Sequence, residues 1–205
     1  GDSGDGLYVH LPPTTALQCL MTLLHHRSRP VLIIGNAATG KTSLVKDWLK
    51  SMDLEQTSRA SIGMHGSLTA ARLQRAILVS LEVKSGRFLA PPGSRRITYF
   101  LDDLHLPEPD AHGTQPPIEL LRQLLDYGHL FDPADGMELF VHQALYAAAM
   151  QASSTAASNQ RLVRHFTPLQ LVDATGDGLL SIFETRALGA FRMYNIDVQR
   201  LVVAV

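Results

Sequence analysis

The 205-residue chain is poor in several residue types, and each shortage excludes a class of protein. Its single cysteine, Cys19, cannot form an intrachain disulfide, so a disulfide-stapled scaffold is excluded and a reducing compartment is favoured. No apolar run approaches the roughly 18 residues of a membrane-spanning helix, so we expect no membrane partner. The 18 basic and 19 acidic residues leave a net charge of -1, which argues against binding nucleic acid by positive charge.

The rest of the composition is that of a globular domain. Hydrophobic residues make up 45% of the chain and charged residues 18%, which excludes a disordered tail. The length allows one good-sized core, or one domain with part of another. Residues 1–6 contain neither an initiator methionine nor the basic and then apolar pattern of a signal peptide, so we expect a piece of a longer polypeptide.

Short apolar runs alternate with helical periodicities along the chain. The runs predict buried strands at residues 31–34, 61–64 and 97–101. Apolar residues recurring every three or four positions predict helices at residues 12–27, 118–127 and 173–191. Two further helices are predicted, one around Leu44, Val45, Trp48 and Leu49 and one around Leu73, Ile77 and Leu81. Residues 139–150 are ambiguous between strand and helix, and residues 153–158 are a predicted loop. This alternation predicts an α/β fold with a mainly parallel sheet flanked by helices.

One eight-residue segment carries the strongest chemical signal. It matches G-x-x-x-x-G-K-[ST] in full, between a predicted strand and a predicted helix. Glycines let the backbone wrap closely round phosphate, and the following helix presents its positive end to the same oxygens. The lysine can reach the β- and γ-phosphates, and the final hydroxyl can ligate Mg²⁺. The predicted nucleotide-binding residues are Gly35, Asn36, Ala37, Ala38, Thr39, Gly40, Lys41 and Thr42.

A phosphate-binding loop acts with a nearby carboxylate for the metal and a group that orients or deprotonates water. Asp102 and Asp103 directly follow a predicted strand, at the end of a parallel sheet where ligands bind. We expect Asp102 to support Mg²⁺ together with Thr42, and Asp103 to be the candidate base. The alternative is a solvated acidic loop. Because aspartate is one methylene shorter than glutamate, nucleotide binding is a firmer expectation than fast hydrolysis.

Four further segments resemble a known family. Residues 100–107 are close to F-x-D-D-x-N-M-P, residues 113–123 to G-x-Q-P-P-I-E-L-L-R-Q and residues 161–166 to R-F-L-R-H-F, and the Ala-Pro-Pro-Gly of residues 90–93 also fits. On these motifs the chain resembles a AAA+ module, and more narrowly the third AAA+ module of axonemal dynein heavy chains. The similarity runs from about residue 7 to residue 188.

The resemblance implies a P-loop AAA+ fold, with a nucleotide-binding α/β domain at residues 1–170 and the start of a helical lid at residues 171–205. It implies one of six modules in a ring formed by one very long chain, with ATP or ADP and Mg²⁺ bound at the border between modules. Arg161 would then be catalytic, as an arginine finger on the nucleotide of the preceding module.

The implied role is an ATP-binding module that couples nucleotide state to microtubule-based movement. The implied partners are the neighbouring AAA+ modules of the same heavy chain, other dynein subunits, and microtubules through parts absent from this sequence. The implied location is cytoplasmic and cytoskeletal, in the axoneme of a cilium or flagellum.

Some residues depart from the family pattern and argue against efficient hydrolysis at this site. Gln151 falls near the position where many AAA+ proteins place an asparagine that orients water, and His105 replaces the asparagine that follows the acidic pair. Residues 151–158 replace a loop rich in glycine and arginine. Two alternatives therefore remain: a stand-alone, ring-forming AAA+ ATPase of the remodelling type, and a structural module that holds nucleotide without hydrolysing it.

A competing motif lies near the C-terminal end of the sequence. Asp173, Thr175, Asp177 and Glu184 occupy ligand positions one, three, five and twelve of an EF-hand calcium loop, with Gly178 at the sixth. An EF-hand needs a helix on both sides and usually a partner motif, and Pro168 makes a poor incoming helix. We therefore favour the start of the helical lid, with its first helix at residues 181–188.

Overall fold

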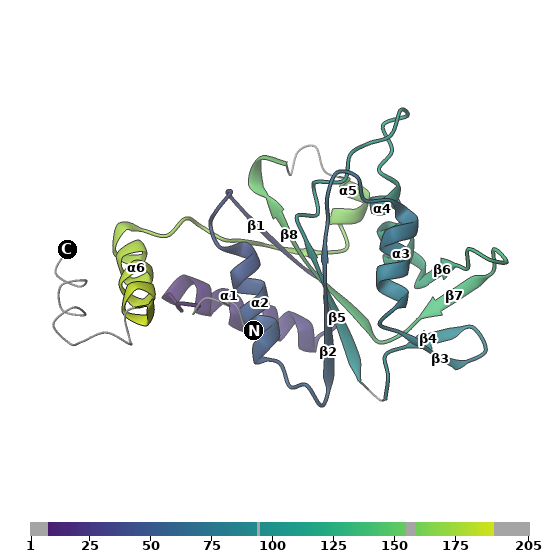
Figure 1. Ribbon diagram of the computed structural model, residues 1–205, viewed down its shortest axis with the longest axis horizontal. Helices are drawn as coiled ribbons and strands as arrows, with labels where there is room; N and C mark the ends of the chain where they lie inside the picture. Colours follow the sequence, from purple (N-terminus) through teal and green to yellow (C-terminus); the bar gives the residue numbers. More distant parts are fainter. Residues whose placement is uncertain (1–7, 94, 155–158, 191–205) are drawn as a thin grey trace.

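A computed structural model describes residues 8–93, 95–154 and 159–190 (Figure 1). The polar start at residues 1–6, residues 155–158 of the predicted loop at 153–158 and the part of the predicted lid beyond residue 190 lie outside the described residues. None of the described helices combines the length and apolar character that crossing a membrane requires.

The main sheet has five strands in the order β2-β5-β8-β1-β9, and all of its pairs are parallel. Its strands are β1 (Val31–Gly35), β2 (Thr57–Gly63), β5 (Arg96–Asp102), β8 (Ala144–Gln151) and β9 (Thr167–Gln170). The predicted α/β fold with a mainly parallel sheet is confirmed. β2 begins four residues before the predicted start, and Pro168 lies in the edge strand β9, where its missing N–H is tolerated.

Helices cover both faces of this sheet. They are α1 (Pro12–His26), α2 (Lys41–Ser51), α3 (Ala70–Leu78), α4 (Pro116–Tyr127) and the single-turn α5 (Gln160–Val163). The helix α6 (Gly176–Ala190) lies to one side of the sheet (Figure 1). A 3₁₀ turn follows β8 at Ala152–Ser154. Figure 1 shows α1 and α2 on one side of the strands, and α3 and α4 on the other.

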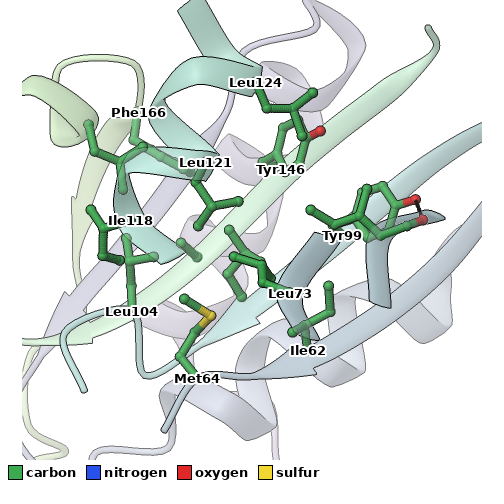
Figure 2. Packing of buried hydrophobic residues seen from close by; sticks show 14 of the residues in the cluster. Ile62, Met64, Leu73, Tyr99, Leu104, Ile118, Leu121, Leu124, Tyr146 and Phe166 are labelled. Atoms are coloured by element: carbon green, nitrogen blue, oxygen red, sulfur yellow. Dashed lines mark hydrogen bonds between the residues drawn. The ribbon is translucent and has the colours of Figure 1, made fainter. Parts of the chain in front are cut away.

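Alternation along the strands divides the core into two clusters. Val31 and Ile33 pack with residues of α1 and α2, including Leu44 and Trp48, whereas Leu32 faces the α3 and α4 side. Figure 2 shows that second cluster, where Leu73 from α3 and Leu121 from α4 point toward the sheet. The central strands are therefore apolar on both faces, which explains why their sequences read as continuous apolar runs.

A second, smaller sheet departs from the expected pattern. It has the order β3-β4-β7-β6, formed by β3 (Glu82–Ser85), β4 (Phe88–Ala90), β6 (His129–Phe131) and β7 (Glu138–Val141). The ambiguous segment at 139–150 is not one element, because β7 ends at Val141 and β8 begins at Ala144. Gln143 lies between them with a φ of 59°. The apolar run thus serves two different sheets.

Two predicted helices differ from their expected bounds by at least three residues at one end. α3 ends at Leu78, so Leu81 is not in the helix but in the connection to β3. α6 begins at Gly176 rather than at Asp173 or Ser181, and it runs through most of the twelve residues that resemble a calcium loop. Asp177, Gly178 and Glu184 are helical, and β9 rather than a helix precedes the segment. Its backbone therefore differs from that of an EF-hand loop.

Two stacked tyrosines of the core allow a comparison between a buried hydroxyl that has a hydrogen-bond partner and one that has none among the described residues. The Tyr99 and Tyr146 rings lie 5.7 Å apart, and the Tyr99 hydroxyl donates to the Ile77 carbonyl at 2.8 Å. The Tyr146 hydroxyl is buried and has no partner among the described residues. We expect Tyr146→Phe to raise the free energy of unfolding by about 1 kcal/mol and Tyr99→Phe to lower it by about 1 kcal/mol, because only the latter loses a hydrogen bond. Urea denaturation measures both, and equal losses would contradict this prediction.

Candidate functional site

The glycine-bearing loop at the C-terminal end of β1 is shaped by two residues with positive φ. Ala38 has a φ of 62°, and Gly40, the residue before α2, has a φ of 89°. A left-handed conformation is easy for glycine and uncommon for other residues. The two left-handed residues turn the chain from β1 into the first turn of α2, where the initial N–H groups of the helix have no intrahelical partners.

Gly35 is required for a different reason, which is close packing. A Cβ atom at this position would lie 2.8 Å from the Leu171 carbonyl oxygen and 3.1 Å from the Thr39 hydroxyl. Leu171 is held there because its N–H donates to the Ile34 carbonyl at 2.7 Å. The segment after β9 therefore lies directly against the start of the loop.

Lys41 is a buried cation whose partners are neutral. Its side chain belongs to a residue that is only 8% exposed, and Nζ donates to the carbonyl oxygens of Gly35, at 3.1 Å, and Asn36. A buried charge is stabilised fully only by an opposite charge or strong hydrogen bonds. The ammonium is thus held inside the loop at a place that favours an anion.

Thr42 and Asp102 contact each other where the loop joins α2. The Thr42 hydroxyl donates to Asp102 Oδ1 at 3.0 Å, joining the first turn of α2 to the end of β5. Burial raises the pKa of the Asp102 carboxyl, the Thr42 hydrogen bond opposes that rise, and the neighbouring Asp103 adds to it. A hydroxyl beside a carboxylate is a donor set that suits Mg²⁺, which takes few protein ligands and keeps several waters.

Asp103 directly follows this carboxylate in a left-handed conformation, with a φ of 56°. The backbone around it is fixed by its neighbours, because Met64 N–H donates to the Asp102 carbonyl and Leu104 N–H donates to the Ala149 carbonyl, each at 2.9 Å. Gln151, at the end of β8, is in register with Gly35 of β1. The structure therefore brings Asp102, Asp103 and Gln151 to the same edge of the sheet as the loop.

One contact of the loop has no signal in the sequence. The Asn36 side-chain amide donates to Asp173 Oδ2 at 3.0 Å, although the two residues are far apart in sequence. Asp173 precedes α6, so the loop is tied to the beginning of that helix. The sequence pattern presents Asp173 as a calcium ligand or as the start of a helix, whereas its pairing with Asn36 depends on the parallel pairing of β1 and β9.

Arg161 is not brought to this loop. It lies exposed on α5, and among the described residues no hydrogen bond or ion pair joins it to the loop or to the acidic pair.

A cavity of about 410 Å³ lies beyond the acidic pair and does not coincide with the loop. That cavity is lined by His105, Gln115 and Asn159 among others, and the buried His105 Nδ1 has no partner among the described residues.

This chain is similar to one protein family and to several known proteins over most of its length. The family described as "P-loop containing dynein motor region" matches residues 4–173. The ciliary dynein beta chain of Heliocidaris crassispina is 37% identical over 86% of this chain, and human dynein axonemal heavy chain 17 is 34% identical over 94%. The flagellar outer arm dynein beta chain of Chlamydomonas reinhardtii is 31% identical over 95%. This chain spans about 4% of the length of each of these relatives.

Proposed function

Because this chain belongs to the P-loop dynein motor family, we propose that it is an ATP-binding AAA+ module of a dynein heavy chain. In this proposal it binds ATP or ADP with Mg²⁺ and couples nucleotide state to microtubule-based movement. The motifs at residues 100–107 and 113–123 favour the third module of the ring. The observation that carries the proposal is the buried Lys41 ammonium beside the Thr42–Asp102 contact.

Each residue of the loop has a distinct task in this proposal. The backbone N–H groups from Gly35 to Thr42 bind phosphate oxygens, and Lys41 exchanges its carbonyl partners for phosphate. Thr42 and Asp102 hold Mg²⁺, which neutralises phosphate charge when it is bound. Asp103 is the candidate base that orients or deprotonates water.

Arg161 acts across a border between modules. Since no hydrogen bond or ion pair joins it to the loop within the described part of the chain, it is suited to the nucleotide of the preceding module, where a guanidinium stabilises charge on the γ-phosphate. The proposed partners are therefore the adjacent AAA+ modules of the same heavy chain, with other dynein subunits and with microtubules through other parts of that chain. The relatives are ciliary, axonemal and flagellar dyneins, so we place this chain in an axoneme.

The test has two parts. Immunoblotting with an antibody against this segment gives the size of the native polypeptide, and we expect several hundred kilodaltons, as a ring of modules on one chain requires. A band near 22.4 kDa would overturn the heavy-chain assignment. Equilibrium dialysis of this chain against ATP and ADP, with Mg²⁺ or with EDTA, tests nucleotide binding separately, and absence of binding in both conditions would overturn it.

Asp102→Asn tests the metal role without removing the Thr42 hydrogen bond, because the amide oxygen still accepts. We expect affinity for nucleotide to fall about tenfold in Mg²⁺ and to be unchanged in EDTA, as expected when a metal-supporting carboxylate is neutralised. Asp103→Asn is the matched control, and it should leave the affinity in Mg²⁺ nearly unchanged. Equal losses in Mg²⁺ and in EDTA would show that Asp102 supports the loop rather than the metal.

Purified alone, this chain is expected to hydrolyse ATP slowly, because the finger for its own site comes from a neighbouring module. The measurement is phosphate release by the isolated chain, with its elution volume in ATP recorded in parallel. Brisk turnover by a monomer would contradict the proposed division of the site between modules. Assembly of the chain into rings with ATP would instead support a stand-alone ATPase, which none of the relatives described above supports.

A further inference from the structure

The short helix α5, which carries Arg161, has little packing of its own. It has four residues, and Leu162 is its only buried side chain. A single turn with one buried anchor is not stable without help from its surroundings. α5 packs against α4, and side chains from α4 reach both of its ends.

Glu119 of α4 holds the N-terminal end. Asn159 caps α5 by accepting the Leu162 N–H at 3.3 Å, and its side-chain amide donates to Glu119 Oε1 at 2.6 Å. The second oxygen of Glu119 accepts from Arg122 Nε at 2.7 Å. Although burial acts in the other direction, the hydrogen bonds from Arg122 and Asn159 and the nearby Arg161 charge hold the pKa of Glu119 below its ordinary value.

Asp126 of α4 holds the C-terminal end. Its Oδ1 accepts from Arg164 Nη2 at 2.7 Å and lies 2.8 Å from His165 Nε2, and both of these residues directly follow α5. Its Oδ2 accepts from Arg122 Nη1 at 2.7 Å. The hydrogen bond from Arg164 is the main cause that lowers the pKa of Asp126. Arg122 therefore links the two carboxylates along α4.

The arginine in α5, Arg161, and the arginine directly after it, Arg164, differ in their contacts. Arg164 is already engaged with Asp126, whereas Arg161 has no hydrogen bond or ion pair among the described residues and projects into solvent. Glu119 is close enough for the Arg161 charge to affect it, but not to bind it directly. Arg161 is the arginine that remains available to an anion outside this module.

We propose that Glu119, Arg122 and Asp126 are positioning residues that clamp α5 at both ends and so fix the direction in which Arg161 projects across the module border. The proposal rests on the function proposed above for Arg161. An exposed arginine on a loosely held turn would sample many positions, and a guanidinium contributes to the transition state only when it is held in place. The clamp provides that order through five charge-assisted contacts.

A double-mutant cycle in the intact heavy chain tests the clamp. The variants are Arg161→Ala, Asp126→Asn and their combination. Asp135→Asn is the control for loss of one carboxylate, because Asp135 pairs with Arg87 between two turns of the smaller sheet. We expect Arg161→Ala to lower ATP turnover at least about tenfold and Asp126→Asn to lower it about threefold to tenfold with KM unchanged. The combination should turn over no more slowly than Arg161→Ala alone, and Asp135→Asn should match the unmodified chain.

The outcomes separate the two proposals. Unchanged turnover in Arg161→Ala would overturn the finger role and the clamp with it. Losses that multiply in the combined variant would overturn the clamp alone, because Asp126 would then act independently of Arg161. Glu119→Gln provides a second route if Asp126→Asn lowers the melting temperature of the heavy chain. It keeps an acceptor for Asn159, weakens the Arg122 contact, and is expected to show the same dependence on Arg161.

Discussion

Lys41→Ala is expected to lower the affinity of this chain for ATP and ADP at least about 100-fold, which corresponds to about 2.7 kcal/mol. The ammonium is held inside the loop by the backbone carbonyls of Gly35 and Asn36. Because it is buried, its interaction with phosphate is little screened by water or salt. Removing it leaves the backbone N–H groups and the helix dipole, which alone hold phosphate much more weakly.

Titration with a fluorescent ADP analogue measures this change. Lys50→Ala is the matched control, since it removes the same charge from the last turn of α2, away from the loop. The affinity of the Lys50→Ala variant for nucleotide should stay within about twofold of that of the unmodified chain. If Lys41→Ala also stayed within twofold, the loop would not be the nucleotide site. The free energy of unfolding without nucleotide is the second readout, because it separates a loss of nucleotide binding from a loss of folding.

The largest expected effect on stability comes from Phe100→Ala, which should lower the free energy of unfolding by about 3–5 kcal/mol. Phe100 is fully buried in the central strand β5 and packs in the cluster under α1 and α2, together with Leu44 and Trp48. The surrounding sheet and helices are held by their own contacts, so they can collapse only partly into the space that the ring leaves.

Phe88→Ala is the control for the same chemical change. Phe88 lies in the smaller sheet, and its side chain belongs to a residue that is 47% exposed. Phe88→Ala should lower the free energy of unfolding by less than about 1.5 kcal/mol. Urea denaturation compares the two variants, with the slope of the transition expected to be unchanged. Similar losses for both would mean that the core under α1 and α2 contributes less than its burial indicates.

The loop and the central strands could be predicted because their signals are local. The apolar run at residues 31–34 and the glycine–lysine pattern after it are complete within one short stretch, and the structure has a strand, loop and helix there. Asp102 could be placed beside Thr42 for a general reason, since parallel strands deliver their C-terminal ends to one edge of the sheet. The roles given to Asp103 and Arg161 remain predictions.

Other features depend on pairings that no single segment contains. β8 is rich in alanine, which favours helix, but a place between β5 and β1 requires a strand buried on both faces. The spacing of Glu119, Arg122 and Asp126 predicts ion pairs along one face of α4, whereas the contacts with α5 depend on the tertiary fold. The smaller sheet was missed because its strands are three or four residues long.

The position of β1 in the main sheet also has a consequence for synthesis on the ribosome. β1 is made early, yet its hydrogen-bonding neighbours are β8 and β9, so Val31 cannot pair until Ala147 and Thr167 have left the exit tunnel. Until then the apolar strand and the phosphate-binding loop have no sheet to join, and closing such distant contacts is slow. A nascent chain of this module therefore exposes an unpaired apolar strand for most of its translation, which makes it a natural client for chaperones that bind extended apolar segments.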